Sequence, residues 1–305
     1  MKIQNNRNIK MSHEIIVDGV IVECDPINSN GYDLVMPIFP EEQPITWAFA
    51  KPYIAKLHSC RGDLAFVDVG TGSGIFACLV AKHFTKLYTT LVDVSSRAIE
   101  FALRNAGRND TRMTTLSTSC GRYTEHHFKP KSVDLIAINP PYHPHPRAVS
   151  RFVPLHARGG EDGQEVFKEQ LSVAGIHLAE DGLVFFNQMA MGNADGPDFL
   201  TYIPELMKAK VSVEWVNIFP PIDTLTFLQG VYGERFASWI RMMAARKSLL
   251  YYVVGIIRND GKGVIRCLDG QFGKGGIDDV RLTRSWGARI ALHHEIANHI
   301  PTQVR

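Results

Sequence analysis

A glycine-rich stretch, residues 65–75, limits more than any other feature what this chain can fold into. It reads AFVDVGTGSGI: an apolar run, then three alternating glycines, and apolar residues follow at helical spacing. This order predicts a buried strand, a tight turn and the start of a helix. Gly70, Gly72 and Gly74 permit backbone dihedrals that a side chain forbids and let a ligand approach the main chain. Because a helix start presents free N–H groups and a positive dipole end, we expect a nucleotide-like or anionic ligand.

The spacing of these glycines argues against a dinucleotide. That fingerprint requires Gly-x-Gly-x-x-Gly, whereas Ile75 occupies the position of the third glycine here. A nicotinamide-dependent oxidoreductase is therefore disfavoured. A strand-to-helix turn that binds nothing stays open as the alternative.

Composition narrows the class of protein. The 305 residues, 45% of them hydrophobic, suffice for one large domain or for a domain with an appendage. A net charge of +2 is too small to indicate a nucleic-acid binder. The five cysteines form no C-x-x-C pair, and the purest apolar run, residues 249–257, is too short to cross a bilayer. We expect a cytoplasmic protein with no metal site and no membrane segment.

Strand and helix patterns alternate along most of the chain. Strands are predicted at 65–69, 87–92, 113–119, 133–138, 183–189, 211–219 and 249–258, after an N-terminal hairpin at 14–24. This alternation predicts an α/β fold with a parallel, doubly wound sheet.

The chain divides into three expected parts. Residues 1–60 form a small N-terminal lid or hairpin with a lead-in helix, and residues 61–260 form the main domain, with an insertion at about 220–248. Residues 261–305 form a C-terminal extension, to which no role is assigned. A short helix is expected near 290–296.

Asp93 ends the second predicted strand of the main domain. Ligands of open parallel sheets bind at the carboxyl ends of the strands, and an acid at this position can accept both hydroxyls of a ribose. The alternative is an aspartate that only caps the following helix.

A second motif, Asn139-Pro140-Pro141-Tyr142, follows the strand at 133–138 directly. The prolines fix their own φ angles and keep the residues before them out of the helical region, so the loop is stiff. A stiff polar loop at a strand end favours a site over a simple connection. His143 comes next and is the one histidine singled out, because it adjoins this loop.

The glycine turn, Asp93 and the Asn-Pro-Pro-Tyr loop, in this order, resemble class I S-adenosylmethionine-dependent methyltransferases of the NPPY kind. Residues 157–163, ARGGEDG, resemble the Gly-Gly-x-Asp-Gly stretch that follows this loop in the "methyltransferase small domain" enzymes, which include the release-factor glutamine N5-methyltransferases. The resemblance covers roughly residues 40–189. It implies a Rossmann-like, seven-stranded methyltransferase sheet and S-adenosyl-L-methionine as the cofactor.

The resemblance also implies site residues. The cofactor would be held by Asp68, Gly70, Thr71, Gly72, Gly74, Asp93, Val94, Cys120 and Asn139. The catalytic residues would be Asn139, Pro140 and Tyr142, and the substrate would meet Pro141, Tyr142 and His143.

Three features depart from the family pattern. An acid often follows the third strand and receives the adenine amine, but Cys120 or its backbone must serve here. Glu42 replaces the threonine of a Pro-Glu-Thr element that covers the cofactor. The N-terminal part is short and strand-like, where the glutamine methyltransferases carry a helical domain that grips the release factor.

The loop suits chemistry at a planar nitrogen. The side-chain oxygen of Asn139 and the carbonyl of Pro140 can each accept one N–H of an amide or adenine NH₂, which holds the nitrogen and aims its lone pair at the sulfonium methyl. Tyr142 can stack on a planar acceptor. A protein glutamine is the favoured acceptor by resemblance, while adenine in RNA or DNA and a small metabolite stay open. A methyltransferase-like subunit that only binds is the non-enzyme alternative.

Overall fold

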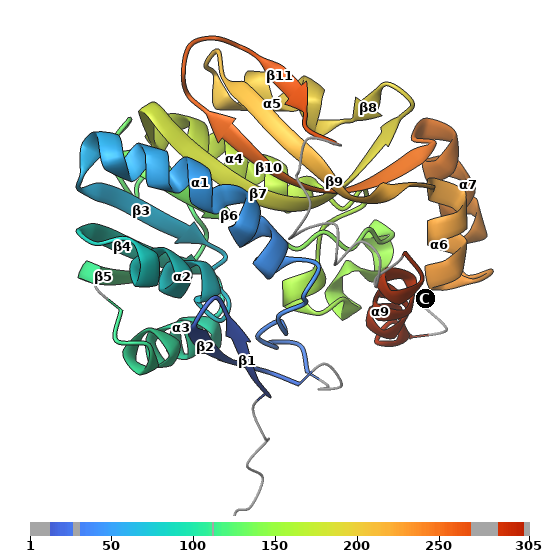
Figure 1. The fold of residues 1–305 in the computed structure, drawn as a ribbon. Helices are drawn as coiled ribbons and strands as arrows, with labels where there is room; N and C mark the ends of the chain where they lie inside the picture. The colour runs from blue at the N-terminus through green and yellow to red at the C-terminus, as the bar shows by residue number, and fades with distance from the viewer. Residues whose placement is uncertain (1–12, 27–30, 112, 270–285, 302–305) are drawn as a thin grey trace, which may run out of the picture.

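A mostly parallel sheet with helices on both faces forms the core of the molecule in the computed structural model, which describes residues 13–26, 31–111, 113–269 and 286–301 (Figure 1). In these ranges the sheet has nine strands, and its main order is β11-β9-β10-β7-β6-β3-β4-β5, with β8 paired to β7. The seven long strands are β3 (Leu64–Val69), β4 (Leu87–Asp93), β5 (Met113–Cys120), β6 (Val133–Ile138), β7 (Leu178–Asn193), β9 (Ser212–Asp223) and β10 (Leu249–Arg258). The two short ones are β8 (Gly196–Pro197) and β11 (Ile265–Cys267). The predicted α/β, Rossmann-like fold is confirmed.

The sheet is parallel from β5 to β7, but β10 runs antiparallel to both β7 and β9. The sequence pattern predicted parallel strands only. The reason lies in the insertion, which forms two helices, α6 (Thr224–Tyr232) and α7 (Ala237–Arg246), beside one end of the sheet (Figure 1). The chain therefore re-enters the sheet where it left, and Leu249 pairs with Asp223. Phe236, Ile240 and Met243 recur at helical spacing, so the sequence predicts only the second of these helices.

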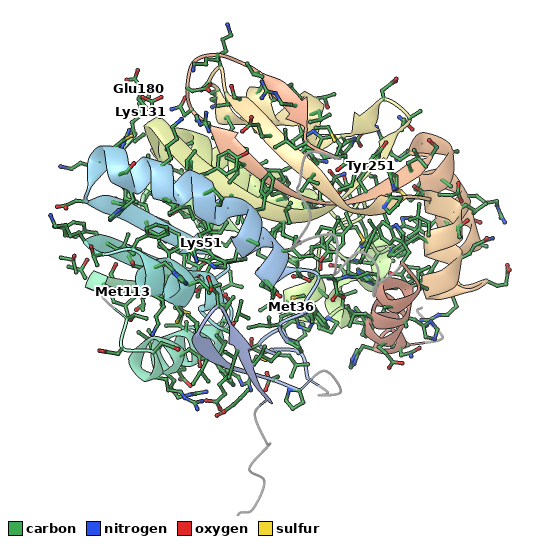
Figure 2. The ribbon with its side chains drawn as sticks, in the orientation of Figure 1. Met36, Lys51, Met113, Lys131, Glu180 and Tyr251 are labelled. Carbon is green, nitrogen blue, oxygen red and sulfur yellow. The ribbon has the colours of Figure 1, made fainter. Side chains whose placement is uncertain are left out.

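Successive residues of the central strands point to opposite faces and build two apolar cores. Phe66 and Leu135 pack in one core with α1 (Gln43–Arg61) and α2 (Ile75–His83). Val67 and Ile136 pack in the other with α4 (Glu165–His177) and α5 (Phe199–Met207). Figure 2 shows the side chains that fill the layers between helices and sheet.

The sequence predicts Ser95 or Ser96 as the N-cap of the helix after the second strand, and Asp162 as the N-cap of the helix that carries Phe167. The structure agrees in part. Helix α3 (Ser96–Arg108) is capped by Ser95, whose hydroxyl oxygen accepts from the Ala98 N–H at 3.1 Å, as expected. Helix α4 has Gln164 rather than Asp162 at its N-cap. The Asp162 carboxylate instead accepts from the backbone N–H of Gln164 at 2.8 Å, which places it one turn before the helix.

The N-terminal strands β1 (His13–Val17) and β2 (Val20–Cys24) form the predicted hairpin. Its turn residue Asp18 accepts hydrogen bonds from Trp47 at 2.7 Å and from Lys51 at 2.8 Å, both on α1. On its other side, the Asn105 side-chain oxygen accepts from the Glu23 N–H at 2.9 Å. The hairpin is therefore fixed between α1 and α3.

The C-terminal helix α9 (Trp286–Asn298) packs against α6. The approach is close, because a Cβ on Gly230 would lie 2.7 Å from Ile290 Cγ2. The Trp286 indole N–H donates to the Pro220 carbonyl at 2.6 Å. Two short 3-10 helices, Arg147–Phe152 and Leu155–Ala157, lie in the loop before α4. No helix in the described part of the chain is long and apolar enough to cross a membrane.

Candidate active site

The glycine turn follows β3 and opens α2, as the sequence predicts. Gly70, Gly72 and Gly74 have φ angles of 68°, 53° and 76°, a region that favours glycine. The backbone N–H groups of Gly70 and Thr71 both donate to the Val92 carbonyl, at 2.8 and 3.1 Å, and hold the turn against β4. A Cβ on Gly74 would lie 2.8 Å from Ala102 of α3, so this third glycine permits helix packing rather than ligand contact.

Residues 69–73 of this turn line the larger of two neighbouring cavities, here called the glycine-turn cavity. It encloses about 1390 Å³ of empty space, part of it open to solvent. Its other walls are Asp33–Met36, Val92–Ser95, Gly121–Tyr123, Asn139, Pro141 and residues of α4. The part of the cavity that compares with ligand pockets is about 280 Å³, close to the lower end of the roughly 300–1,000 Å³ that such pockets occupy.

Asp93 lies on the wall of the glycine-turn cavity at the carboxyl end of β4. One of its carboxylate oxygens accepts from the Gly72 N–H and the other from the Ser95 N–H, both at 2.9 Å. Burial raises the pKa of this carboxyl group above its ordinary value. Each oxygen keeps a further acceptor position, so Asp93 both fixes the turn and can accept hydroxyls from a ligand.

Two residues predicted to bind the cofactor do not lie on the wall of the glycine-turn cavity. Asp68 lies beneath the turn, where its carboxylate accepts from the Thr71 hydroxyl at 2.8 Å and from the Ala77 N–H at 3.3 Å. It supports the turn and is not among the residues that line the cavity. Cys120 is exposed at the end of β5 and does not line the cavity either. Its neighbours 121–123 lie there instead, because β5 ends at Cys120 and the chain turns inward after it.

The environment of Asp68 predicts a pH effect on stability. Burial raises the pKa of its carboxyl group from 3.8 to about 7, so between these values the folded protein holds a proton that the unfolded chain has lost. Stability therefore falls as the pH rises through this range. We expect Asp68→Asn to reduce this fall, measured as the shift of the urea midpoint between about pH 5 and about pH 8. An equal shift in both proteins would contradict this role.

Asn139, at the end of β6, carries the clearest unsatisfied group on the cavity wall. Its side-chain N–H donates to Glu42 Oε1 at 3.2 Å. Its side-chain oxygen is buried and has no hydrogen-bond partner in the described structure. Since a buried acceptor without a partner is costly, this oxygen is prepared for a donor that a ligand brings.

Glu42 is the centre of a buried polar network behind the Asn-Pro-Pro-Tyr loop. It is fully buried at the N-cap of α1. Besides Asn139, its carboxylate accepts from the Tyr142 hydroxyl at 2.6 Å, the Tyr252 hydroxyl at 3.1 Å and the Arg289 guanidinium at 3.0 Å. Arg289, 1% exposed, also contacts both tyrosine hydroxyls. The C-terminal helix thus anchors the loop that carries Asn139.

Sequence reasoning missed the role of Arg289 in this network. Glu42 stood out only as a replacement for threonine, and Tyr252 reads as part of an apolar strand. Arg289 and His293 are four residues apart on α9 and both are buried. That spacing is the one signal in the tail, and by itself it is weak.

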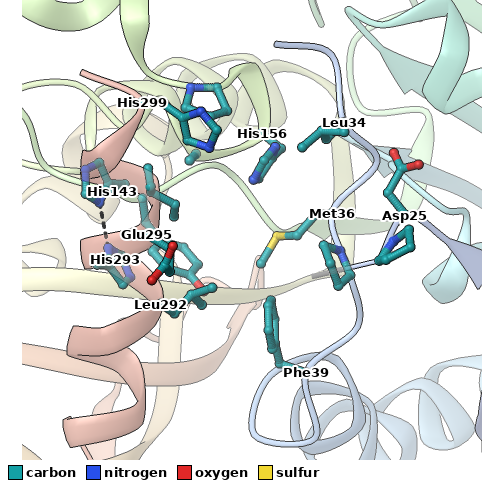
Figure 3. A pocket seen from close by; sticks show the side chains of 16 residues that line it. Asp25, Leu34, Met36, Phe39, His143, His156, Leu292, His293, Glu295 and His299 are labelled. Atoms are coloured by element: carbon teal, nitrogen blue, oxygen red, sulfur yellow. Dashed lines mark hydrogen bonds between the residues drawn. The ribbon is translucent and has the colours of Figure 1, made fainter. Parts of the chain in front are cut away.

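Tyr142 and His143 line the second cavity, here called the histidine-lined cavity, and not the glycine-turn cavity (Figure 3). This space lies between residues 34–39, the loop after β6 and α9. The two cavities share Leu34, Met36 and His156 as walls, so they adjoin. The Tyr142 ring is 5% exposed and its hydroxyl is already bonded, so it offers an edge of the wall rather than a free stacking platform.

Comparison with known proteins identifies the central part of the chain. Residues 54–186 match the family model described as the methyltransferase small domain. This segment is a methyltransferase small domain. The match confirms the family predicted from the sequence, and with it the expectation that this domain is of the S-adenosylmethionine-dependent methyltransferase class.

The methyltransferase domain has curated relatives of moderate identity. It is 35% identical over 130 residues to a ribosomal protein uL3 glutamine methyltransferase of Bradyrhizobium diazoefficiens, covering 38% of each chain. A release factor glutamine methyltransferase of Koribacter versatilis is 32% identical, over 38% of this chain and 43% of the relative. The Bacillus subtilis protein of the same name is 31% identical, over 59% and 54%. The chain thus spans less than two thirds of the length of each of these relatives.

Within the described residues, most predicted site residues lie together at the carboxyl ends of the parallel strands. Gly70, Thr71, Gly72, Asp93, Val94, Asn139 and Pro141 line the glycine-turn cavity. Tyr142 and His143 line the adjoining one, Pro140 is buried between Asn139 and Pro141, and Asp68 and Gly74 support the turn from behind. Their individual roles stay predictions.

Proposed function

We propose that this protein is an S-adenosylmethionine-dependent N-methyltransferase that acts on a planar amide or amino nitrogen. The observation that carries the proposal is the buried, unpartnered side-chain oxygen of Asn139 on the wall of the glycine-turn cavity. A planar NH₂ supplies the donor that this oxygen lacks. When bound, the cofactor supplies an activated methyl group on a positively charged sulfur.

The residues of the glycine-turn cavity fit this cofactor. The glycine turn at 70–72 leaves main chain uncovered beside the start of α2, which suits the polar methionine end. Asp93 keeps acceptor positions for the ribose hydroxyls. Gly121, Arg122 and Tyr123 are the residues we expect at the adenine in place of Cys120.

The chain itself must orient the acceptor nitrogen. Glu42 accepts from the Asn139 amide and thereby fixes which side-chain atom of Asn139 is nitrogen and which is the free oxygen. An acceptor N–H donated to that oxygen is held in place, and the Pro140 carbonyl is the expected second acceptor. Transfer then needs positioning rather than a strong base.

The proposed methyl acceptor rests on the names of the matched relatives. The names of the matched relatives make a protein glutamine the reference acceptor, and adenine and a metabolite amide or amine are the alternatives to test beside it. A cytoplasmic location and the three-part division at residues 60 and 260 are further proposals.

Asp93 provides the test of the cofactor site. We expect Asp93→Ala to weaken S-adenosylhomocysteine binding about 10- to 100-fold in calorimetric titration, because hydrogen bonds to a charged group contribute about 1.5–3 kcal/mol. Cys120→Ala is the matched control and should bind as the unchanged protein does. Equal affinities for all three proteins would show that Asp93 does not contact the cofactor. If the unchanged protein does not bind S-adenosylhomocysteine, the proposed cofactor is wrong.

A further inference from the structure

The histidine-lined cavity has walls of two kinds (Figure 3). Leu34, Met36 and Phe39 on one side and Leu292 and Ile296 of α9 on the other are apolar. Four histidines also line the space, His143, His156, His293 and His299. Two carboxylates lie on the same walls: Asp25, which is paired with Arg97, and Glu295, which disfavours an anionic ligand. Because it adjoins the glycine-turn cavity, a ligand in it can extend toward the Asn139 loop.

A chain of hydrogen bonds fixes the state of the deepest histidines. The Tyr232 hydroxyl donates to the Pro144 carbonyl at 2.7 Å, so its single proton is used. Its oxygen, 2.8 Å from His143 Nε2, must therefore accept from that nitrogen. His143 Nδ1 then has no proton in the neutral ring and accepts from His293 Nδ1, 2.7 Å away.

These hydrogen bonds determine the state of Nε2, the second ring nitrogen of His293. With Nδ1 protonated, Nε2 of the neutral ring is a lone-pair acceptor. The side chain is 1% exposed, and Nε2 has no hydrogen-bond partner among the residues that the structure describes. Nδ1 of His156, on the wall shared by both cavities, is likewise buried without a partner. Two ring nitrogens of the wall thus await partners.

His293 and His156 are neutral at physiological pH. Burial, together with the nearby Arg289 guanidinium, lowers the pKa of His293 to about 3. Burial also lowers the pKa of His156 to about 4. Neutral rings do not attract anions, so the polar contacts offered here suit uncharged N–H or O–H groups.

We propose that the histidine-lined cavity binds the methyl acceptor, and that this acceptor is a small, flat, uncharged molecule with an N–H or O–H donor for His293 Nε2. The inference rests on the proposed function and names its substrate class. The apolar walls suit a flat ring, which can extend into the adjoining glycine-turn cavity because the histidine-lined cavity alone measures only about 70 Å³. The donor of such a ligand satisfies the buried nitrogen. A lone glutamine side chain is aliphatic, and its single carboxamide is required at Asn139, so it leaves His293 without a partner.

The test compares three probes of one shape by ligand-observed NMR, with S-adenosylhomocysteine present. Benzamide is flat, uncharged and has N–H donors; N,N-dimethylbenzamide has none; and benzoate is an anion. We expect millimolar benzamide to bind, and the other two to bind at least about tenfold more weakly, the effect of one lost hydrogen bond at a buried site. No binding of benzamide, or equal binding of all three, would overturn the proposal.

The His293→Phe variant locates the contact. The ring remains but the acceptor nitrogen is lost, so benzamide should bind about tenfold more weakly. His294→Phe, the same change on the neighbouring residue outside the cavity, should leave benzamide binding unchanged. Equal losses in both variants would contradict the assignment, and if His293→Phe does not fold, the three probes on the unchanged protein still decide. Cofactor binding is measured separately, so failure of the proposed function stays distinguishable from failure here.

Discussion

Arg289→Met is expected to lower the free energy of unfolding by about 3 to 5 kcal/mol, because it leaves Glu42 charged and buried without its cationic partner. Both side chains are almost wholly buried, at 1% and 0% exposure, and their ion-pair distance is 3.0 Å. Arg289 also supports the hydroxyls of Tyr142 and Tyr252. The effect is measured as the change in urea-induced unfolding.

Arg266→Met is the matched control for this prediction. Arg266 pairs with Glu214 at 3.6 Å, but its side chain is 55% exposed. Exposed ion pairs contribute about 0 to 1 kcal/mol, so this variant should remain near the stability of the unchanged protein. Similar losses for Arg266 and Arg289 would show that the buried network does not hold the C-terminal helix in place.

Asn139→Ala is expected to reduce the rate of methyl transfer about 10²- to 10³-fold, the usual cost of losing one preorganised polar contact to the reacting group. The affinity for S-adenosylhomocysteine should change far less, because the turn at 70–72 and Asp93 remain. Asn259→Ala removes an asparagine at the opposite edge of the sheet, where it bonds the Ala179 carbonyl at 3.0 Å, and should keep full activity. A parallel loss of rate and cofactor affinity in Asn139→Ala would indicate structural damage.

The parts of the fold that sequence reasoning predicts are those with local signals. The glycine turn shows itself through three glycines within five residues, and these three have positive φ angles in the structure. Most of the long strands carry a run of apolar residues, and β5 (Met113–Cys120) is instead rich in threonine and serine. The sequence predicts all seven to within a few residues, apart from both ends of β7 and the end of β9. The sequence singles out Asn139 as a predicted site residue because two prolines mark its loop.

The parts that it misses depend on contacts between distant residues. Glu42 and Arg289 are 247 positions apart in the chain, and His143 and His293 are 150 apart. No periodicity or spacing connects such pairs, because each residue alone looks like an ordinary helix, helix-cap or loop position. The antiparallel direction of β10 was also missed, since it depends on where α6 and α7 lie and not on the strand's own residues. Cys120 was assigned by its position in the sequence, although the cavity wall begins one residue later.

The most direct test of the account supplies S-adenosylmethionine with a ¹³C-labelled methyl group and a fractionated cell lysate to the unchanged protein and to Asn139→Ala. The label is followed by NMR into protein, nucleic-acid and small-molecule fractions. We expect a methyl carbon bonded to nitrogen, formed by the unchanged protein and almost absent with Asn139→Ala. A methyl group on oxygen or carbon, or equal transfer by both proteins, would contradict it.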